Sequence, residues 1–242
     1  MKFEAIFFDL FGTLVDDFVS SVGQMHQEMA TALGAPYEQF MQFWGQTAKM
    51  RIIGAFETVE ANIEYVCDAM KVKPRADQIE KAVEIRMKYI RQALQPKADA
   101  INTPSELKNQ GHKIGLLSNC SIEIPILWQE TAFADLFDTT IFSSRERLKK
   151  PDPRIYHLAC ERLGAAPSSC LYIADGEDYE LSAAARVGLF PVLIRTPSQK
   201  NDGRLHQEAR EWQGTTIASL PELLQLVGKS GTNDDRVGPL QK

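Results

Sequence analysis

The chain has 242 residues, of which 44% are hydrophobic and 24% are charged, and its formal net charge is −5. This composition is ordinary for a globular protein with a substantial core, either one large domain or one domain carrying an insertion. The acidic balance argues against nucleic acid as the main partner, and no apolar run is long enough to span a bilayer. The N-terminus is too short in apolar residues for a secretory signal, and the four scattered cysteines include no CxxC pair, so we expect reduced thiols in a cytoplasmic protein.

Short β-rich runs alternate with helical patterns in most of the chain. The first run is FEAIFF at 3–8, and similar runs follow at 113–118, 139–142, 170–174 and 191–194. Residues 152–165 show apolar side chains at helical spacing between two of these runs. The alternation predicts an α/β fold, a doubly wound, mainly parallel, Rossmann-like sheet with helices on both faces.

The interval between the first two runs breaks this alternation. Residues 17–98 show one helical pattern after another, such as FETVEANIEYVCDAM at 56–70 and ADQIEKAVEIRMKYIRQAL at 76–94. Because this interval is too long for one crossover, we expect a separate helical domain inserted into a core formed by residues 1–16 and 99–228. The polar, glycine-rich residues 229–242 are predicted to be disordered.

Polar side chains follow four of the predicted strands. In an open α/β sheet, ligands bind at the carboxyl ends of the strands. Each polar group alone is also typical of a turn, a helix cap or a solvated surface charge. Together they would bring a carboxylate, two neutral donors, a cation and an acidic cluster to one edge: Asp9 with Gly12 and Thr13; Ser118 and Asn119; Lys150; and Asp175, Gly176, Asp178 and Glu180.

Four segments carry a family resemblance. DLFGTLVD, LLSN, KKPDPRIY and IADGEDYELSAAARVG resemble the four motifs of the haloacid dehalogenase-like (HAD) hydrolase superfamily. The resemblance covers residues 3–17 and about 100–195, and the helical insertion stands where the helical-cap (C1-type) members have their cap domain. It implies a hydrolase with an aspartate nucleophile.

The resemblance also implies roles for the polar residues. Asp9 would be the nucleophile and form a covalent aspartyl intermediate. Lys150 would neutralise Asp9 and the bound anion. Ser118 and the backbone amide of Asn119 would hold phosphate oxygens, and Thr13 would help to orient them.

A metal site is implied by the same motifs. Asp9, Asp175 and the backbone carbonyl of Phe11 would bind Mg²⁺, which takes oxygen ligands and keeps several waters. Glu180 stands where many relatives have aspartate, and its longer side chain is expected to bind the metal through water.

Phe11 departs from the pattern of the family's phosphatases, which carry a second aspartate two residues after the nucleophile. That aspartate protonates the leaving oxygen, and general acid–base assistance is typically worth ~10²–10⁴ in rate. Three interpretations remain open: a phosphatase whose substrate has a good leaving group, a metal-independent 2-haloacid-type dehalogenase, or a catalytically weak binding protein. The acidic cluster of Asp175 and Glu180 favours the Mg²⁺-dependent phosphatase.

The predicted cap should exclude water and supply specificity. Arg51 is a candidate for binding a substrate carboxylate or phosphate through its bidentate fork, with a solvated position on a helix face as the alternative. We expect a small phosphorylated or halogenated substrate, no nucleic acid or membrane partner, and a monomer or homodimer.

Overall fold

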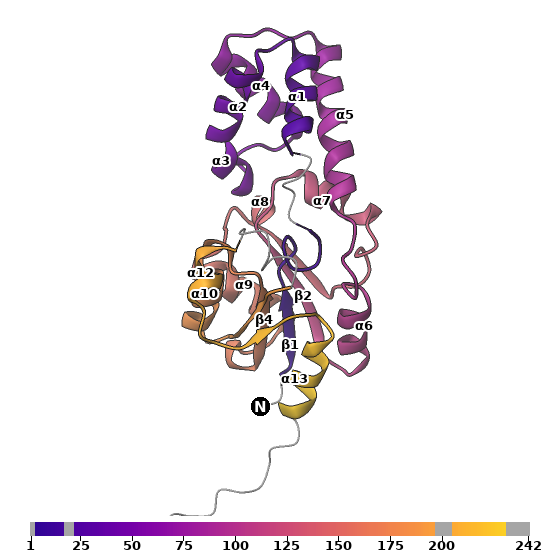
Figure 1. Ribbon diagram of the computed structural model, residues 1–242, viewed down its shortest axis with the longest axis vertical. Coiled ribbons are helices and arrows are strands. Elements are labelled where there is room, and N and C mark those ends of the chain that lie inside the picture. Colours follow the sequence, from indigo (N-terminus) through magenta and orange to yellow (C-terminus); the bar gives the residue numbers. More distant parts are fainter. Residues whose placement is uncertain (1–2, 17–21, 197–204, 231–242) are drawn as a thin grey trace, which may run out of the picture.

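The computed structural model describes residues 3–16, 22–196 and 205–230. Its centre is a parallel six-stranded sheet with the order β3-β2-β1-β4-β5-β6 (Figure 1). This confirms the predicted α/β fold. The strands are β1 (Ala5–Phe8), β2 (Lys113–Ser118), β3 (Thr139–Phe142), β4 (Cys170–Ala174), β5 (Phe190–Ile194) and β6 (Thr216–Ile217).

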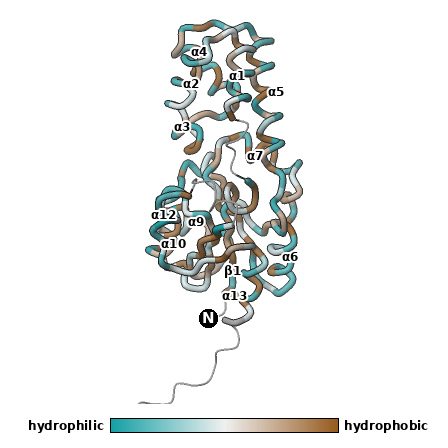
Figure 2. The backbone as a smooth tube through the Cα atoms, viewed as in Figure 1, coloured by the Kyte–Doolittle hydropathy of each residue, from teal (hydrophilic) through white to brown (hydrophobic). Residues whose placement is uncertain are grey.

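The central strands are apolar because both faces of the sheet are covered. In β1, Ile6 and Phe8 belong to one buried cluster and Phe7 belongs to the cluster on the opposite face. A strand covered on both sides reads as a continuous apolar run instead of an alternating one. Figure 2 shows the hydrophobic residues concentrated in these strands.

Helices cover both faces of the sheet. One face is covered by α6 (Asn102–Asn109) and α13 (Glu222–Ser230), and the other by α9 (Pro153–Leu163), α10 (Glu180–Val187) and α12 (Gln207–Glu211). Two short helices, α7 (Glu123–Leu127) and α8 (Ser143–Glu146), follow β2 and β3. The sheet is therefore doubly wound, as the sequence predicts.

Five helices form a second layer beyond the carboxyl end of the sheet (Figure 1). In the described part of residues 17–98, every regular element is a helix, and these helices bury a separate hydrophobic cluster that includes Met29, Phe40 and Ile63. We propose that this layer is the cap domain, with its boundaries as predicted. The helices are α1 (Val22–Leu33), α2 (Tyr37–Gln46), α3 (Ala48–Ile52), α4 (Val59–Met70) and α5 (Ala76–Ala93).

The two connections between the layers run side by side. Val15 forms an antiparallel bridge with Pro96, and the backbone N–H of Lys97 donates to the carbonyl oxygen of Leu14 at 2.9 Å. The Lys97 ammonium also donates to the carbonyl oxygen of Gly12 at 2.6 Å. The helical layer is thus attached directly to the loop that follows Asp9.

Three other expectations can be compared with the described residues. The four cysteines are buried free thiols, as predicted. No described helix is long and apolar enough to cross a membrane. Of the tail predicted to be disordered, residues 231–242 lie outside the described residues, while α13 continues to Ser230.

Candidate active site

Asp9 lies directly after β1, where the chain turns away from the sheet. Its backbone N–H still donates to the carbonyl oxygen of Ile173 at 2.9 Å, so the central strand holds it in place. The turn that follows requires a positive φ of 73° at Gly12, a conformation that glycine adopts without steric cost. The Asp9 side chain is 6% exposed, so its carboxylate points from the strand end into a nearly closed site.

Lys150 is the cation of this site. Its Nζ lies 2.5 Å from Asp9 Oδ1, 2.5 Å from Glu180 Oε2 and 2.9 Å from the hydroxyl of Tyr172. These three contacts use the three donors of an ammonium group. Burial lowers the pKa of Lys150, but the carboxylates of Asp9 and Glu180 raise it further, so the lysine is charged.

Glu180 has both carboxylate oxygens occupied. Oε2 accepts hydrogen bonds from Lys150 and from the Tyr172 hydroxyl, the latter at 2.5 Å, and Oε1 accepts from the backbone N–H groups of Gly176 and Glu177 at 3.2 and 3.1 Å. The Tyr156 hydroxyl donates to the backbone carbonyl of Glu180 at 2.9 Å. Glu180 therefore acts as the counter-ion of Lys150, a role that the sequence did not indicate.

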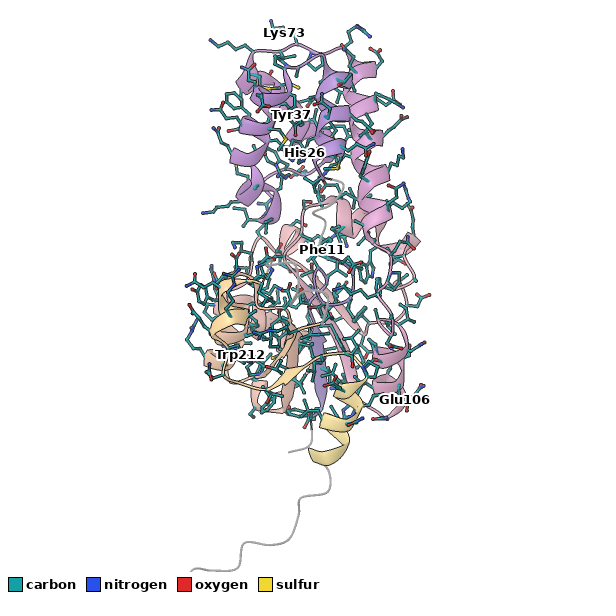
Figure 3. The ribbon with its side chains drawn as sticks, in the orientation of Figure 1. Phe11, His26, Tyr37, Lys73, Glu106 and Trp212 are labelled. Carbon is teal, nitrogen blue, oxygen red and sulfur yellow. The ribbon has the colours of Figure 1, made fainter. Side chains whose placement is uncertain are left out.

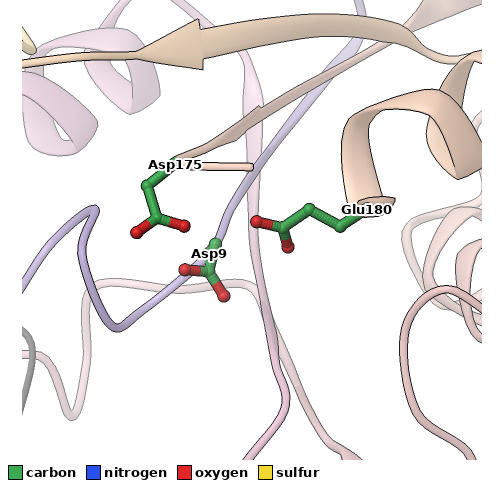
Figure 4. Close-up of side chains that lie close together, drawn as sticks. All are labelled: Asp9, Asp175 and Glu180. Carbon is green, nitrogen blue, oxygen red and sulfur yellow. The ribbon is translucent and has the colours of Figure 1, made fainter. Parts of the chain in front are cut away.

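Asp175 differs from Glu180 in having an oxygen without a partner. It follows β4 and is 4% exposed; its Oδ2 lies 3.3 Å from His206 Nε2, and its Oδ1 has no hydrogen-bond partner among the described residues. Oxygens of Asp9, Asp175 and Glu180 lie within 4.8 Å of one another, and Figure 4 shows the three carboxylates converging.

The site gathers more negative than positive charge. Three buried carboxylates, from Asp9, Asp175 and Glu180, surround one buried ammonium, so these four side chains carry a charge of −3 + 1 = −2. Burial raises the pKa of Asp9, Lys150 lowers it, and Glu180 and Asp175 raise it again, with a net upward shift. An additional cation would therefore stabilise the ionised form of Asp9.

Two hydroxyl groups beside the carboxylates lack partners. Thr13 and Ser118 are fully buried, and neither Thr13 Oγ1 nor Ser118 Oγ has a hydrogen-bond partner among the described residues. Such groups are rare in native proteins and often mark a place where a ligand binds. Asn119 has a different role: its side chain accepts from the Lys150 N–H at 2.8 Å and donates to the Lys150 carbonyl at 3.1 Å, so it holds the lysine loop against the end of β2.

The remaining two predicted positions lie at the junction with the helical layer. Phe11 is partly buried against the apolar cluster of the sheet and brings no acid to the site (Figure 3). Arg51 is half-buried, and so it is not a solvated helix-face arginine. It donates to the carbonyl oxygen of Trp44 at 2.8 Å and to the Thr47 hydroxyl at 2.5 Å, with its guanidinium 4.3 Å from the centre of the Trp44 ring. None of its described hydrogen bonds reaches the carboxylates.

Sequence reasoning missed three residues of the site: Tyr156, Tyr172 and His206. Tyr172 carried a usable signal, because a tyrosine in the fully apolar strand CLYIA needs a partner for its buried hydroxyl. The other two carried none, since nothing in the sequence places them beside Glu180 or Asp175.

The doubly wound sheet, with a buried aspartate–lysine pair at its carboxyl edge, has the architecture of a hydrolase that uses a carboxylate nucleophile. Residues 3–188 match the haloacid dehalogenase-like hydrolase family, and the chain belongs to that family.

Characterised relatives include two kinds of enzyme. The chain is 27% identical over 207 residues to Phosphatase MT3486 from Mycobacterium tuberculosis, a match covering 84% of this chain and 92% of that protein. It is 28% identical over 194 residues to an (S)-2-haloacid dehalogenase from Pseudomonas fluorescens, covering 76% of this chain and 81% of that protein. The structure of a HAD phosphatase from Thermococcus onnurineus superposes with a TM-score of 0.63 at 18% identity, covering 94% of this chain and 98% of that one.

Proposed function

We propose that the protein is a Mg²⁺-dependent phosphohydrolase that acts on a small phosphorylated molecule through Asp9. The observation that supports this best is the uncompensated charge of −2 beside the unpartnered Oδ1 of Asp175. A divalent cation at Asp9 and Asp175 would neutralise the site, and Mg²⁺ prefers such oxygen ligands. The backbone carbonyl of Phe11 is the third expected ligand. Glu180, bound to Lys150, is not needed as a direct ligand.

The residues divide the chemistry among them. The Asp9 carboxylate attacks phosphorus, forming an aspartyl phosphate as the bond to the leaving oxygen breaks; water then hydrolyses this acyl phosphate, releases phosphate and regenerates the carboxylate. Lys150 keeps Asp9 ionised and oriented, and the hydroxyl groups of Thr13 and Ser118 donate to phosphoryl oxygens. Bound Mg²⁺ supplies charge neutralisation and polarises the phosphoryl group.

Phe11 limits the range of substrates. Because no carboxyl group stands at this position, the leaving oxygen must depart without a proton from the enzyme. Acyl and aryl phosphates should therefore be hydrolysed much faster than alkyl phosphates. Phe11→Asp should selectively increase kcat/KM for alkyl phosphates, by up to the ~10²–10⁴ that a positioned acid contributes.

Dehalogenation is the second candidate function. It is favoured by Phe11, because a halide leaves without protonation, and by the (S)-2-haloacid dehalogenases among the relatives. The charge balance around Asp175 is the argument against it. A binding protein without catalysis is the third candidate, and the retained pair of Asp9 and Lys150 is the argument against that one.

One experiment separates the three functions. Phosphate release from p-nitrophenyl phosphate and acetyl phosphate, and chloride release from (S)-2-chloropropionate, are measured with Mg²⁺ and with EDTA. We expect phosphate release only, lost with EDTA and lost in Asp9→Asn and Asp175→Ala. Asp178→Asn, an exposed acid three residues from Asp175, is the matched control and should keep activity. Chloride release that persists in EDTA would establish dehalogenation, and no turnover of any of the three would support the binding protein.

A further inference from the structure

A groove on the outside of the molecule lies between the helical layer and the sheet domain. It has a volume of about 760 Å³ and shares no residue with the site around Asp9. One side is formed by α4 and α5, and the other by α7 and the 3-10 turn Trp128–Glu130. We call it the α5–α7 groove; its lining is Glu60, Glu64, Ala76, Ile79, Glu80, Val83, Glu84, Met87, Arg91, Ile126, Leu127 and Glu130.

The floor of the groove is an apolar stripe. Ile79, Val83 and Met87 follow one another at four-residue spacing on α5, so they lie in a row about 12 Å long, at a rise of ~1.5 Å per residue. All three are only partly buried. Across the groove, Ile126 of α7 is 48% exposed, one of the few large hydrophobic side chains that the described residues leave so open. Two helices thus present apolar side chains to one unfilled channel.

The rim of the groove is acidic. The lining contains five glutamates and one arginine, a charge of −5 + 1 = −4. Arg91 is paired with Glu130 at 2.8 Å, and Glu84 is paired with Lys81 at 2.9 Å. The other three glutamates, Glu60, Glu64 and Glu80, form no ion pair with any described residue.

We propose that the α5–α7 groove binds a basic amphipathic helix of a partner protein. A helix lying in a groove uses apolar anchors at i, i+3, i+4 and i+7, which is the spacing that the stripe on α5 can accept. Lysine and arginine residues flanking those anchors would meet the unpaired glutamates, giving electrostatic complementarity. A second copy of this chain fits less well, because its net charge is −5.

The position of the groove suggests what the partner would do. Directly at the α5–α7 contact lies the ion pair between Arg86 and Glu123, which joins the helical layer to the sheet domain. A helix that touches both walls would hold the two layers in one relative arrangement.

The test uses a defined peptide with the full-length protein. An 18-residue, fluorescein-labelled helix of leucine and lysine, with leucine at i, i+3, i+4 and i+7, is titrated with protein and followed by anisotropy. The groove variant is Glu60→Gln/Glu64→Gln/Glu80→Gln. The control variant, Glu38→Gln/Asp68→Asn/Glu161→Gln, removes three exposed acids elsewhere. We expect the groove variant to bind about tenfold more weakly, as the loss of three exposed charge pairs predicts, and the control variant to bind like wild type.

Two further probes separate groove binding from general charge attraction. Val83→Asp, on the floor, should also weaken binding, and a shuffled peptide of the same composition should bind poorly to wild type. Equal weakening by both triple variants, or equal binding of the shuffled peptide, would overturn the proposal. So would a wild-type dimer in sedimentation that the groove variant dissociates, because the occupant would then be a second copy.

Discussion

Removing one partner of the ion pair between Arg86 and Glu123 should destabilise the protein strongly. Arg86 Nε lies 2.6 Å from Glu123 Oε1, and the two side chains are 8% and 2% exposed. At this distance the attraction is about 6 kcal/mol for an effective dielectric constant of ~20, and desolvation offsets much of it. Arg86→Met or Glu123→Leu would leave a buried charge without its partner, which typically costs ~3–5 kcal/mol.

The double variant distinguishes charge pairing from packing. Because Arg86→Met/Glu123→Leu removes both charges and keeps apolar volume, it should lose less than about 2 kcal/mol, leaving a coupling energy well above ~1 kcal/mol. The assay is urea unfolding of the four proteins, supported by thermal unfolding. A loss of ~3–5 kcal/mol should lower Tm by about 6–20 °C in a chain of this size. Single variants that each lose less than 1 kcal/mol, or a double variant equal to their sum, would refute this reasoning.

Three other substitutions test separate parts of the structure. Tyr172→Phe removes a hydrogen bond to Lys150 and should lower kcat about tenfold with little change in KM, measured on the best substrate found. Burial, followed by the neighbouring arginines, lowers the pKa of His26 to about 4, so its contribution to stability is present above pH 6.5 and is lost as the pH falls toward 4. His26→Gln should therefore reduce the loss of unfolding free energy between pH 6.5 and 4.5 by about 2 kcal/mol. Gly54→Ala should destabilise the protein by at least ~2 kcal/mol in urea unfolding, because φ is +67° and a Cβ would lie 1.8 Å from the carbonyl oxygen of Ser144.

Each of these substitutions has a matched control. For Tyr172→Phe it is Tyr65→Phe, an exposed tyrosine of the helical layer, and an equal fall in kcat for both would remove the positioning role. For His26→Gln it is the exposed His157→Gln, and an unchanged pH dependence in His26→Gln would contradict the stated cause. For Gly54→Ala it is Gly34→Ala, which shares the φ of +67° but has no atom closer than 3.7 Å, so equal costs would show that the contact with Ser144 is unimportant.

The strands could be predicted because the sheet is covered on both faces. Four of the five predicted runs lie within a residue or two of their strands, since a buried parallel strand is a short apolar run bounded by turns. The strand β6, Thr216–Ile217, was missed because two residues show no periodicity, and its pairing with β5 depends on a distant part of the chain.

The candidate site could be predicted only as far as strand ends locate it. Asp9, Ser118, Lys150 and Asp175 follow from the rule that ligands bind at the carboxyl edge, but the pairing of Lys150 with Glu180 does not. That pairing depends on the Tyr172 hydroxyl and on two backbone amides that face Glu180, contacts that no spacing in the sequence encodes.

The bridge between Val15 and Pro96 has a consequence for how this architecture can change over evolution. Since entry to and exit from the helical layer are adjacent, about eighty residues leave the sheet and return to nearly the same point. An exchange of this segment for another unit with neighbouring termini leaves the strand order intact, as domain insertions generally require. New substrate preferences can therefore arise by replacing one module, while the chemistry at the strand ends is inherited unchanged.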